Sequence, residues 1–240
     1  MRYRPGYPPE VMELLKSECG LTPVWVVADI GSGTGFLTQV FLENGNRTFG
    51  IEPNAEMRRA GEEFLSSYPG FVSINGSAEE TSLGNHGVDL IAAGQAAHWF
   101  EPQKARREFL RILKPDGWLV LVWNERRMDT PFLREYEQLL LAYGTDYQEV
   151  RHERTTAEMG AFFGPASFKE GSFPLVQEFD YAGLEGRLLS SSYTPGPEQA
   201  NFASMLRELR ELFDTHHVNG KVAFEYSTRV FYGRLAHNDG

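Results

Sequence analysis

The stretch Val26-Val27-Ala28-Asp29-Ile30-Gly31-Ser32-Gly33-Thr34-Gly35-Phe36-Leu37 decides the fold. A mainly apolar run leads into three glycines at alternate positions, and a segment with helical character follows them. This order predicts a buried strand, a tight turn and the start of a helix. Gly31 and Gly33 allow a ligand to approach the backbone more closely than a Cβ would, and the helix start offers unpaired N–H groups. The stretch is therefore expected to line a ligand-binding site.

The rest of the first half of the chain alternates β-rich runs with segments of helical periodicity. The helical segments are predicted at 55–66 and 105–113, and Lys114-Pro115-Asp116-Gly117 predicts a turn after the second. Such alternation is typical of a parallel sheet covered on both faces. The predicted strands are 24–29, 48–52, 71–74, 88–93 and 118–123.

The second half of the chain changes this rhythm. Helices are predicted at about 133–143 and at 197–213, and a strand at about 173–179. Residues 222–232 alternate strictly between two faces, which is typical of an antiparallel strand near a sheet edge. We therefore expect an α/β fold, Rossmann-like and doubly wound, whose mostly parallel sheet has an antiparallel last strand and a helical partial cap.

The composition narrows the range of partners. The chain has 240 residues, against roughly 150 for a typical domain, and its 23 basic and 33 acidic residues give a net charge of −10. This charge gives no bulk attraction for a phosphate backbone, so no nucleic-acid partner is expected. Apolar runs such as 118–123 are far too short to span a membrane, and the single cysteine, Cys19, fits a reducing compartment. No membrane partner and a cytoplasmic location are expected.

The spacing of the glycines indicates which ligand the loop favours. A dinucleotide loop reads G-x-G-x-x-G, whereas Phe36 stands at the last of these positions here. Asp29 precedes the loop, where a carboxylate repels a pyrophosphate and attracts an ammonium or sulfonium group. Glu52, 21 positions after Gly31, can accept both hydroxyls of a ribose. The pattern favours a cationic nucleoside ligand. The simpler alternative is that Asp29 and Glu52 are solvated loop carboxylates or cap helices.

With these residues in place, the sequence resembles the class I S-adenosylmethionine-dependent methyltransferases, closely over about residues 20–125 and loosely in the tail. The resemblance implies that the acid and the glycines hold the methionine part of the cofactor and that Glu52 binds its ribose. It implies further that Pro53, Asn54 and Met57 flank the adenine. The residues implied for the methionine part are Asp29, Gly31, Gly33 and Gly35.

Two further segments carry the resemblance. Ser77-Ala78-Glu79 stands where the family has acid-alanine-glutamate; serine is a departure, since its hydroxyl is a weaker partner for the adenine amino group. A backbone contact from Ala78 is still implied, as are cofactor contacts from Glu79. The segment 88–100 matches the fourth strand of the family and implies a cofactor contact from Gln95.

His98 is the candidate catalytic residue. It follows the predicted strand 88–93 and is therefore expected at the carboxyl edge of the sheet, where open α/β sheets bind ligands. Its intrinsic pKa suits a general base. The alternative is that His98 and Trp99 only form the wall of the pocket.

Each of the remaining candidate residues also has a purely structural explanation. Arg126 and Arg127 could hold a substrate carboxylate or lie exposed at a strand end. The N-terminal residues Tyr3, Arg4 and Tyr7 could close over the ligand or fray. His216-His217 is interpreted as a helix-end pair, and no metal site is expected. Aromatic residues of the insertions could line an acceptor pocket or pack in a small core: Phe162, Phe163, Phe168, Tyr181 and Tyr193.

The resulting prediction is one methyltransferase domain over residues 1–240, with a cofactor-binding core at 20–125 and insertions at about 125–220 forming a substrate cap. We expect transfer of a methyl group from S-adenosylmethionine to a small organic acceptor. The alternatives are a nicotinamide-dependent oxidoreductase, an aminopropyltransferase and a cofactor-binding module without turnover. The acceptor, the choice among oxygen, nitrogen and carbon, and the oligomeric state stay open.

Overall fold

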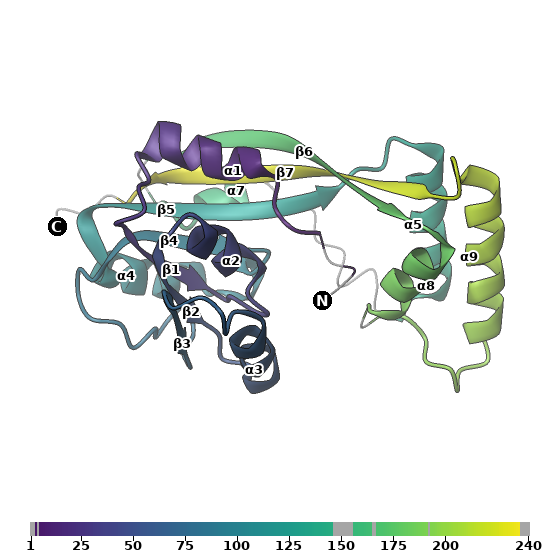
Figure 1. Ribbon diagram of the computed structural model, residues 1–240, viewed down its shortest axis with the longest axis horizontal. Helices are drawn as coiled ribbons and strands as arrows, with labels where there is room; N and C mark the ends of the chain where they lie inside the picture. The colour runs from purple at the N-terminus through teal and green to yellow at the C-terminus, as the bar shows by residue number, and fades with distance from the viewer. Residues whose placement is uncertain (1–2, 4, 146–155, 165–166, 192, 236–240) are drawn as a thin grey trace. The chain divides into compact units, whose positions relative to one another are not determined.

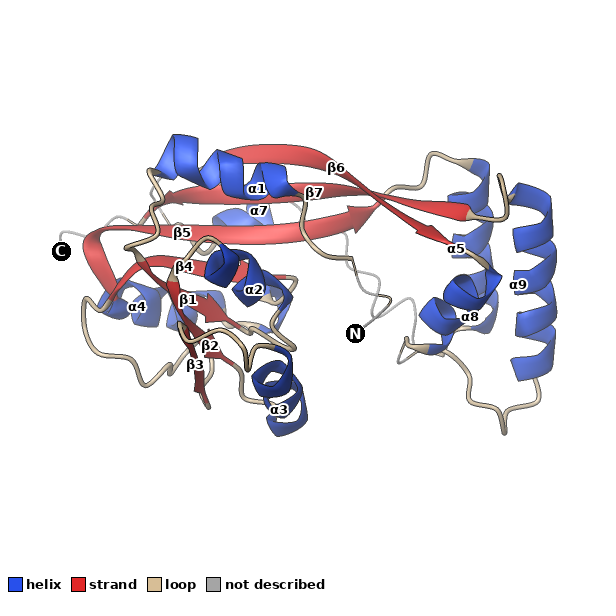
Figure 2. Ribbon diagram, in the orientation of Figure 1, coloured by secondary structure: helices blue, strands red, loops and turns tan. Residues whose placement is uncertain are grey.

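A computed structural model describes residues 3, 5–145, 156–164, 167–191 and 193–235 (Figure 1). Within these ranges seven strands form one sheet in the order β3-β2-β1-β4-β5-β7-β6 (Figure 2). The strands are β1 (Val26–Ile30), β2 (Arg47–Ile51), β3 (Phe71–Ile74), β4 (Val88–Gly94), β5 (Leu113–Arg126), β6 (Lys169–Phe179) and β7 (Val222–Arg234). The helical elements are α1 (Pro9–Leu14), η1 (Leu15–Cys19), α2 (Phe36–Glu43), α3 (Ala55–Phe64), η2 (Ala97–Trp99), α4 (Pro102–Ile112), α5 (Pro131–Tyr143), α7 (Thr156–Gly160), α8 (Tyr181–Leu189) and α9 (Phe202–His216).

The sheet is parallel from β3 to β5. β1 pairs with β2 and β4, β2 with β3, and β4 with β5, all in the parallel sense. β7 is antiparallel to β5. Arg127 N donates to Glu225 O, and Thr228 Oγ1 donates to the Asn124 side chain, so residue numbers fall along β7 as they rise along β5. The strand arrows in Figure 2 show the same reversal. The predicted parallel sheet with an antiparallel last strand is confirmed.

The chain divides into two compact units, which we describe separately. The sheet unit comprises residues 6–124, 154–173 and 228–240, and the helical unit comprises residues 1–5, 125–153 and 174–227. The parts of β5, β6 and β7 beyond these divisions belong to the helical unit. A substrate cap formed by residues 125–220 remains a prediction.

Alternation along the strands gives the sheet unit a core on each face of its sheet. Val27 of β1 packs with α1, η1 and α2, whereas Ala28, the next residue, packs with α4 on the other face. The same alternation continues in β4, where Leu90 and Ile91 separate in this way. Because successive side chains of a strand point to opposite faces, both faces need helices. The core of the helical unit lies among α5, α8, α9 and β7, with Tyr136 and Phe224 near its centre.

The structure corrects the predicted turn at Lys114–Gly117. These residues belong to β5, where Leu113 pairs with Val88 and Trp118 pairs with Leu90. The intervening residues form a bulge opposite Asp89, and Lys114 Nζ lies 2.7 Å from its carboxylate. Proline and glycine therefore mark an irregularity within the strand here, since a bulge, like a turn, needs residues that leave the hydrogen-bond ladder.

Candidate functional site

The glycine loop joins β1 to α2 with three glycines in the left-handed region: φ is +67° at Gly31, +56° at Gly33 and +93° at Gly35. A Cβ on Gly31 would lie 2.6 Å from the Cβ of Ala96, so this glycine is needed for packing. A Cβ on Gly33 would meet only the Met57 methyl, at 3.8 Å. Gly33 is therefore the glycine beside which a ligand can approach the backbone.

Asp29 lies at the base of this loop and is 1% exposed. Its Oδ2 accepts a hydrogen bond of 2.6 Å from Thr38 Oγ1, whereas no residue that the structure describes donates to its Oδ1. Burial raises the pKa of Asp29 to about 7, against the lowering effect of Thr38 and with a smaller raising effect from the Glu52 charge. A buried carboxyl with an unsatisfied oxygen favours a ligand that brings a donor or a positive charge.

Glu52 follows β2 and is 7% exposed. Its Oε2 accepts from Gly33 N at 2.9 Å and its Oε1 accepts from Asn54 N at 2.8 Å. Asn54 in turn caps α3, its Oδ1 accepting from the Glu56 and Met57 amides. Glu52 thus fixes both the glycine loop and the start of α3, and since a carboxylate has about four acceptor positions, it can still bind ribose hydroxyls. Pro53 lies exposed beside it.

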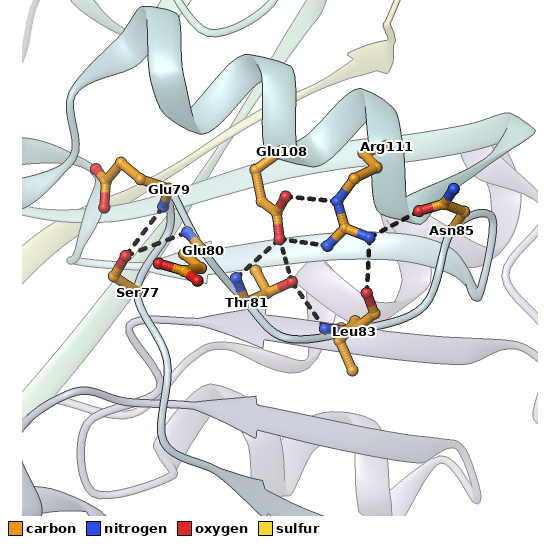
Figure 3. Close-up of polar contacts among 8 residues, drawn as sticks. All are labelled: Ser77, Glu79, Glu80, Thr81, Leu83, Asn85, Glu108 and Arg111. Carbon is orange, nitrogen blue, oxygen red and sulfur yellow. Dashed lines mark hydrogen bonds and ion pairs between the residues drawn. The ribbon is translucent and has the colours of Figure 1, made fainter.

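The segment predicted to contact adenine forms a turn of its own. Ser77 Oγ accepts from the amides of Glu79 and Glu80, each at 3.2 Å, and its O–H can still donate (Figure 3). Ala78 is buried, and Glu79 Oε1 accepts from Glu101 N at 2.9 Å. The segment is therefore held by its own hydrogen bonds and by the one from Glu101.

The residues that follow are fastened to α4 by Glu108, which sequence reasoning missed. One carboxylate oxygen of Glu108 accepts from both Thr81 N (2.8 Å) and Thr81 Oγ1 (2.6 Å), and Arg111 donates to both oxygens at 2.7 Å (Figure 3). Burial raises the pKa of Glu108, but the hydrogen bonds from Arg111 and Thr81 outweigh it and hold the pKa at about 2. The only sequence signal was the i, i+3 spacing of Glu108 and Arg111.

Asn124 connects three parts of the sheet unit. Its Nδ2 donates to Gly6 O at 2.9 Å, and its Oδ1 accepts from Thr228 Oγ1 at 2.6 Å. Its backbone N and O both bond to the Gln95 side chain, at 2.8 and 3.3 Å. Gln95, predicted to contact the cofactor, has φ +56° and directs these side-chain bonds to Asn124.

The residue after Gly6 extends this connection toward the glycine loop. The Tyr7 ring leaves no room for a Cβ on Gly94, the last residue of β4. Burial and the nearby Asp29 charge raise the pKa of Tyr7. Tyr7 therefore lies at the carboxyl edge of the sheet close to Asp29. Arg4 lies outside the described residues, and Tyr3 belongs to the helical unit.

His98 lies in η2, directly after β4. Its ring centroid is 4.6 Å from that of Trp99 and 5.2 Å from that of Trp123. His98 is partly buried, whereas Trp99 is 80% exposed. The histidine is thus placed at the predicted edge within an aromatic group, which fits both a base and a pocket wall.

The remaining candidates separate into two groups. In the helical unit, Arg126 forms an ion pair with Glu137, and Arg127 pairs with Asp129 and Glu225, so each already has acidic partners. His216 Nε2 lies 2.9 Å from Glu135 Oε2 at the end of α9. Phe162, Phe163 and Phe168 pack in the core of the sheet unit, whereas Tyr181 and Tyr193 pack in the helical unit.

The described residues contain no group of three or more histidine, cysteine, aspartate or glutamate side chains placed to hold a metal ion. No helix among them is both long and apolar enough to cross a membrane. The residues that do come together are Asp29, the glycine loop, Glu52, Met57 and Tyr7, all at the carboxyl ends of β1, β2 and β4.

Residues 28–121 match a family of methyltransferase domains. The chain is 35% identical, over 157 residues, to an uncharacterised methyltransferase of Mycobacterium tuberculosis (strain H37Rv), a match that covers 65% of this chain and 60% of that protein. It is 33% identical, over 138 residues, to an uncharacterised methyltransferase of Schizosaccharomyces pombe, covering 57% and 54%. The matched part thus spans somewhat over half the length of these relatives.

Solved structures show the same fold. A protein of Anaeromyxobacter dehalogenans, provisionally named a type II methyltransferase, aligns with a TM-score of 0.71 at 22% identity, over 97% of this chain and 98% of that one. The geranyl diphosphate C-methyltransferase of Streptomyces coelicolor, solved with S-adenosyl-L-homocysteine, aligns with a TM-score of 0.52 at 12% identity, over 95% and 77%. Residues 28–121 therefore match a methyltransferase domain, and the chain shares its fold with these solved structures.

Proposed function

We propose that this chain transfers a methyl group from S-adenosylmethionine to a small organic acceptor. The observation that carries the proposal is the buried Asp29 carboxyl, whose Oδ1 has no donor among the described residues, at the base of a loop with three left-handed glycines. A ligand with an ammonium group and a sulfonium charge supplies the donor and the positive charge that this carboxyl lacks.

The residues around the loop fit the other parts of the cofactor. Gly33 offers an open backbone, and Glu52, fixed by two backbone amides, keeps acceptor positions for ribose hydroxyls. Pro53 and Met57 are proposed to flank the adenine, with Ser77, Ala78 and Glu79 at its edge. Because these two hydrogen bonds already fix the Glu52 side chain, its acceptor oxygens are in place before a ligand binds, which lowers the entropy cost of binding.

When bound, the cofactor supplies an electrophilic methyl group carried by a sulfonium. The protein then needs to align the acceptor with this methyl group and exclude water. Tyr7, held at the sheet edge by the Gly6–Asn124 bond, is proposed to exclude water beside Asp29. His98 is proposed to take the proton of an acceptor that must lose one, because it follows β4 at the same edge.

A small organic acceptor is proposed because the charge of −10 gives no general attraction for nucleic acid.

Calorimetric titration of the full chain with S-adenosylmethionine, S-adenosylhomocysteine and NADH tests the cofactor. We expect micromolar binding of both adenosyl ligands, lost in Glu52→Ala and kept in Glu63→Ala, which removes an exposed carboxylate of α3. Binding of NADH alone would instead support the oxidoreductase. A screen of acceptors with methyl-labelled cofactor then tests turnover, and binding without any labelled product would favour a binding module.

A further inference from the structure

Arg187 of α8 lies among aromatic rings in the helical unit. Its guanidinium carbon is 4.4 Å from the centre of the Phe224 ring, 5.7 Å from that of Tyr226 and 5.8 Å from that of Phe179. One of its N–H groups donates to Tyr3 O at 2.8 Å. No carboxylate among the described residues forms an ion pair with it. Its other N–H groups thus have no hydrogen-bond partner among the described residues.

A buried tyrosine, Tyr226, is one of the rings near this guanidinium. Tyr226 is 3% exposed, and its hydroxyl has no hydrogen-bond partner in the part of the chain that the structure describes. The positive charges of Arg187 and Arg126 both act on this phenol. Because a buried O–H without a partner is costly, this hydroxyl and the Arg187 guanidinium together favour a ligand that supplies hydrogen-bond acceptors.

The arrangement differs from that of the other arginines described in this unit. Arg126 has Glu137 as its acid, and Arg210, which also stacks on an aromatic ring, has Asp214 at 3.0 Å. Arg187 is thus the arginine with rings around it and without a described acid. A partly buried guanidinium gains most from an anion that shares its planar geometry.

Two residues that contact Arg187 border a space for the body of such an anion. Tyr3 and Phe179, which contact Arg187, also line a cavity of about 360 Å³. Two acids line this cavity as well, but Lys221 pairs with Glu178 at 3.2 Å and Asp180 accepts from Gly183 N to cap α8. The aromatic walls favour an apolar or aromatic group next to the charged end of the ligand.

We propose that Arg187 and Tyr226 form a binding site for an organic carboxylate with an apolar body. The guanidinium takes the carboxylate through two parallel N–H donors, the Tyr226 hydroxyl donates a third hydrogen bond, and Phe179 packs against the body. The site belongs entirely to the helical unit, and its existence does not depend on methyl transfer.

Calorimetric titration of the full chain with phenylacetate, phenylacetamide and inorganic phosphate tests the site. We expect phenylacetate to bind, and phenylacetamide, of the same shape without charge, to bind at least about tenfold more weakly. Arg187→Met should lower phenylacetate affinity at least about tenfold, and Tyr226→Phe, which leaves the ring packing intact, about threefold to tenfold. Arg210→Met is the matched control and should change affinity less than about twofold, because its guanidinium already has Asp214.

Equal binding of the acid and the amide, or no binding of phenylacetate, would overturn the proposal. So would equal losses in the Arg187 and Arg210 variants, or phosphate binding tighter than phenylacetate, which would assign the site to a phosphate group. S-adenosylhomocysteine is titrated into the same proteins and should bind all of them alike. If it binds none of them while phenylacetate binds the wild type, the proposed function fails and the carboxylate site stands.

Discussion

Replacing Asp29 by asparagine is expected to remove a pH dependence of folding that this buried carboxyl imposes. Burial raises its pKa from 3.8 to about 7, while Thr38 opposes this shift. Between these values the folded chain keeps a proton that the unfolded chain releases, so the free energy of unfolding falls as the pH rises. The stabilising contribution is complete below about pH 4 and is lost as the pH passes 7.

The size of this change in the free energy of unfolding follows from the difference between the two pKa values. Each pH unit changes the free energy of unfolding by at most about 1.4 kcal/mol, so roughly three units give about 4 kcal/mol as an upper bound. Urea unfolding of the wild type, Asp29→Asn and Asp89→Asn between pH 4.5 and 8 measures it. We expect the wild type to lose stability relative to Asp29→Asn over this range, and Asp89→Asn, whose carboxylate pairs with Lys114, to follow the wild type.

The comparison between variants cancels the titration of groups that do not interact with Asp29. Parallel curves for the wild type and Asp29→Asn would refute the inference that the folded chain holds a proton on Asp29. The same proton competes with a cationic cofactor, so the affinity for S-adenosylmethionine should rise with pH toward 7 in the wild type and stay flat in Asp29→Asn.

Three further predictions concern the loop, the base and the ion pair. Gly33→Ala and Gly20→Ala should each lose about 1 kcal/mol of stability, because both glycines have positive φ and open space. In a titration, only Gly33→Ala should weaken S-adenosylhomocysteine binding, by about tenfold or more. Equal binding by the two variants would show that the loop is not the cofactor site. His98→Gln should lower turnover far more than cofactor affinity, measured by steady-state kinetics and titration, and unchanged turnover would leave His98 as pocket wall. Glu108→Gln should lose up to about 3 kcal/mol of stability at pH 7, measured by urea unfolding, because a Glu108 pKa held at about 2 stabilises the folded chain above the ordinary carboxyl pKa of 4.5. The difference between the variant and the wild type should vanish as the pH falls toward 2. A difference independent of pH would contradict the ion-pair account.

The sheet could be predicted because its signals are local. Strands such as 71–74 and 88–93 are short apolar runs between turn residues, and the alternation at 222–232 reports one buried face directly. The bulge at Lys114–Gly117 could not be separated from a turn, because proline and glycine suit both. What distinguishes them is the pairing of Leu113 with Val88, which is a contact between distant residues.

The candidate site was predictable in its residue types and not in its bonds. Asp29 and Glu52 stand out by their position at strand ends, but the bond from Gly33 N to Glu52 depends on how two loops meet. Gln95 matched the pattern of a cofactor contact, whereas its side chain bonds to Asn124, which no spacing rule connects to it. Arg187 gave no sequence signal, because the lack of an acid partner among the described residues shows only in the folded surroundings of the side chain.

The bonds of Asn124 also bear on when, during synthesis, the sheet unit is complete. The Asn124 side chain joins Gly6, 118 positions before it, to Thr228, 104 positions after it. Strand β7, which carries Thr228, lies between β5 and β6 although it follows both in the sequence. The residues of the glycine loop are made early, but the segment that carries Tyr7 gains its full support only after Thr228 has been translated. Contacts so distant in sequence form slowly, so the edge of the sheet beside Asp29 is expected to be among the last regions to become ordered.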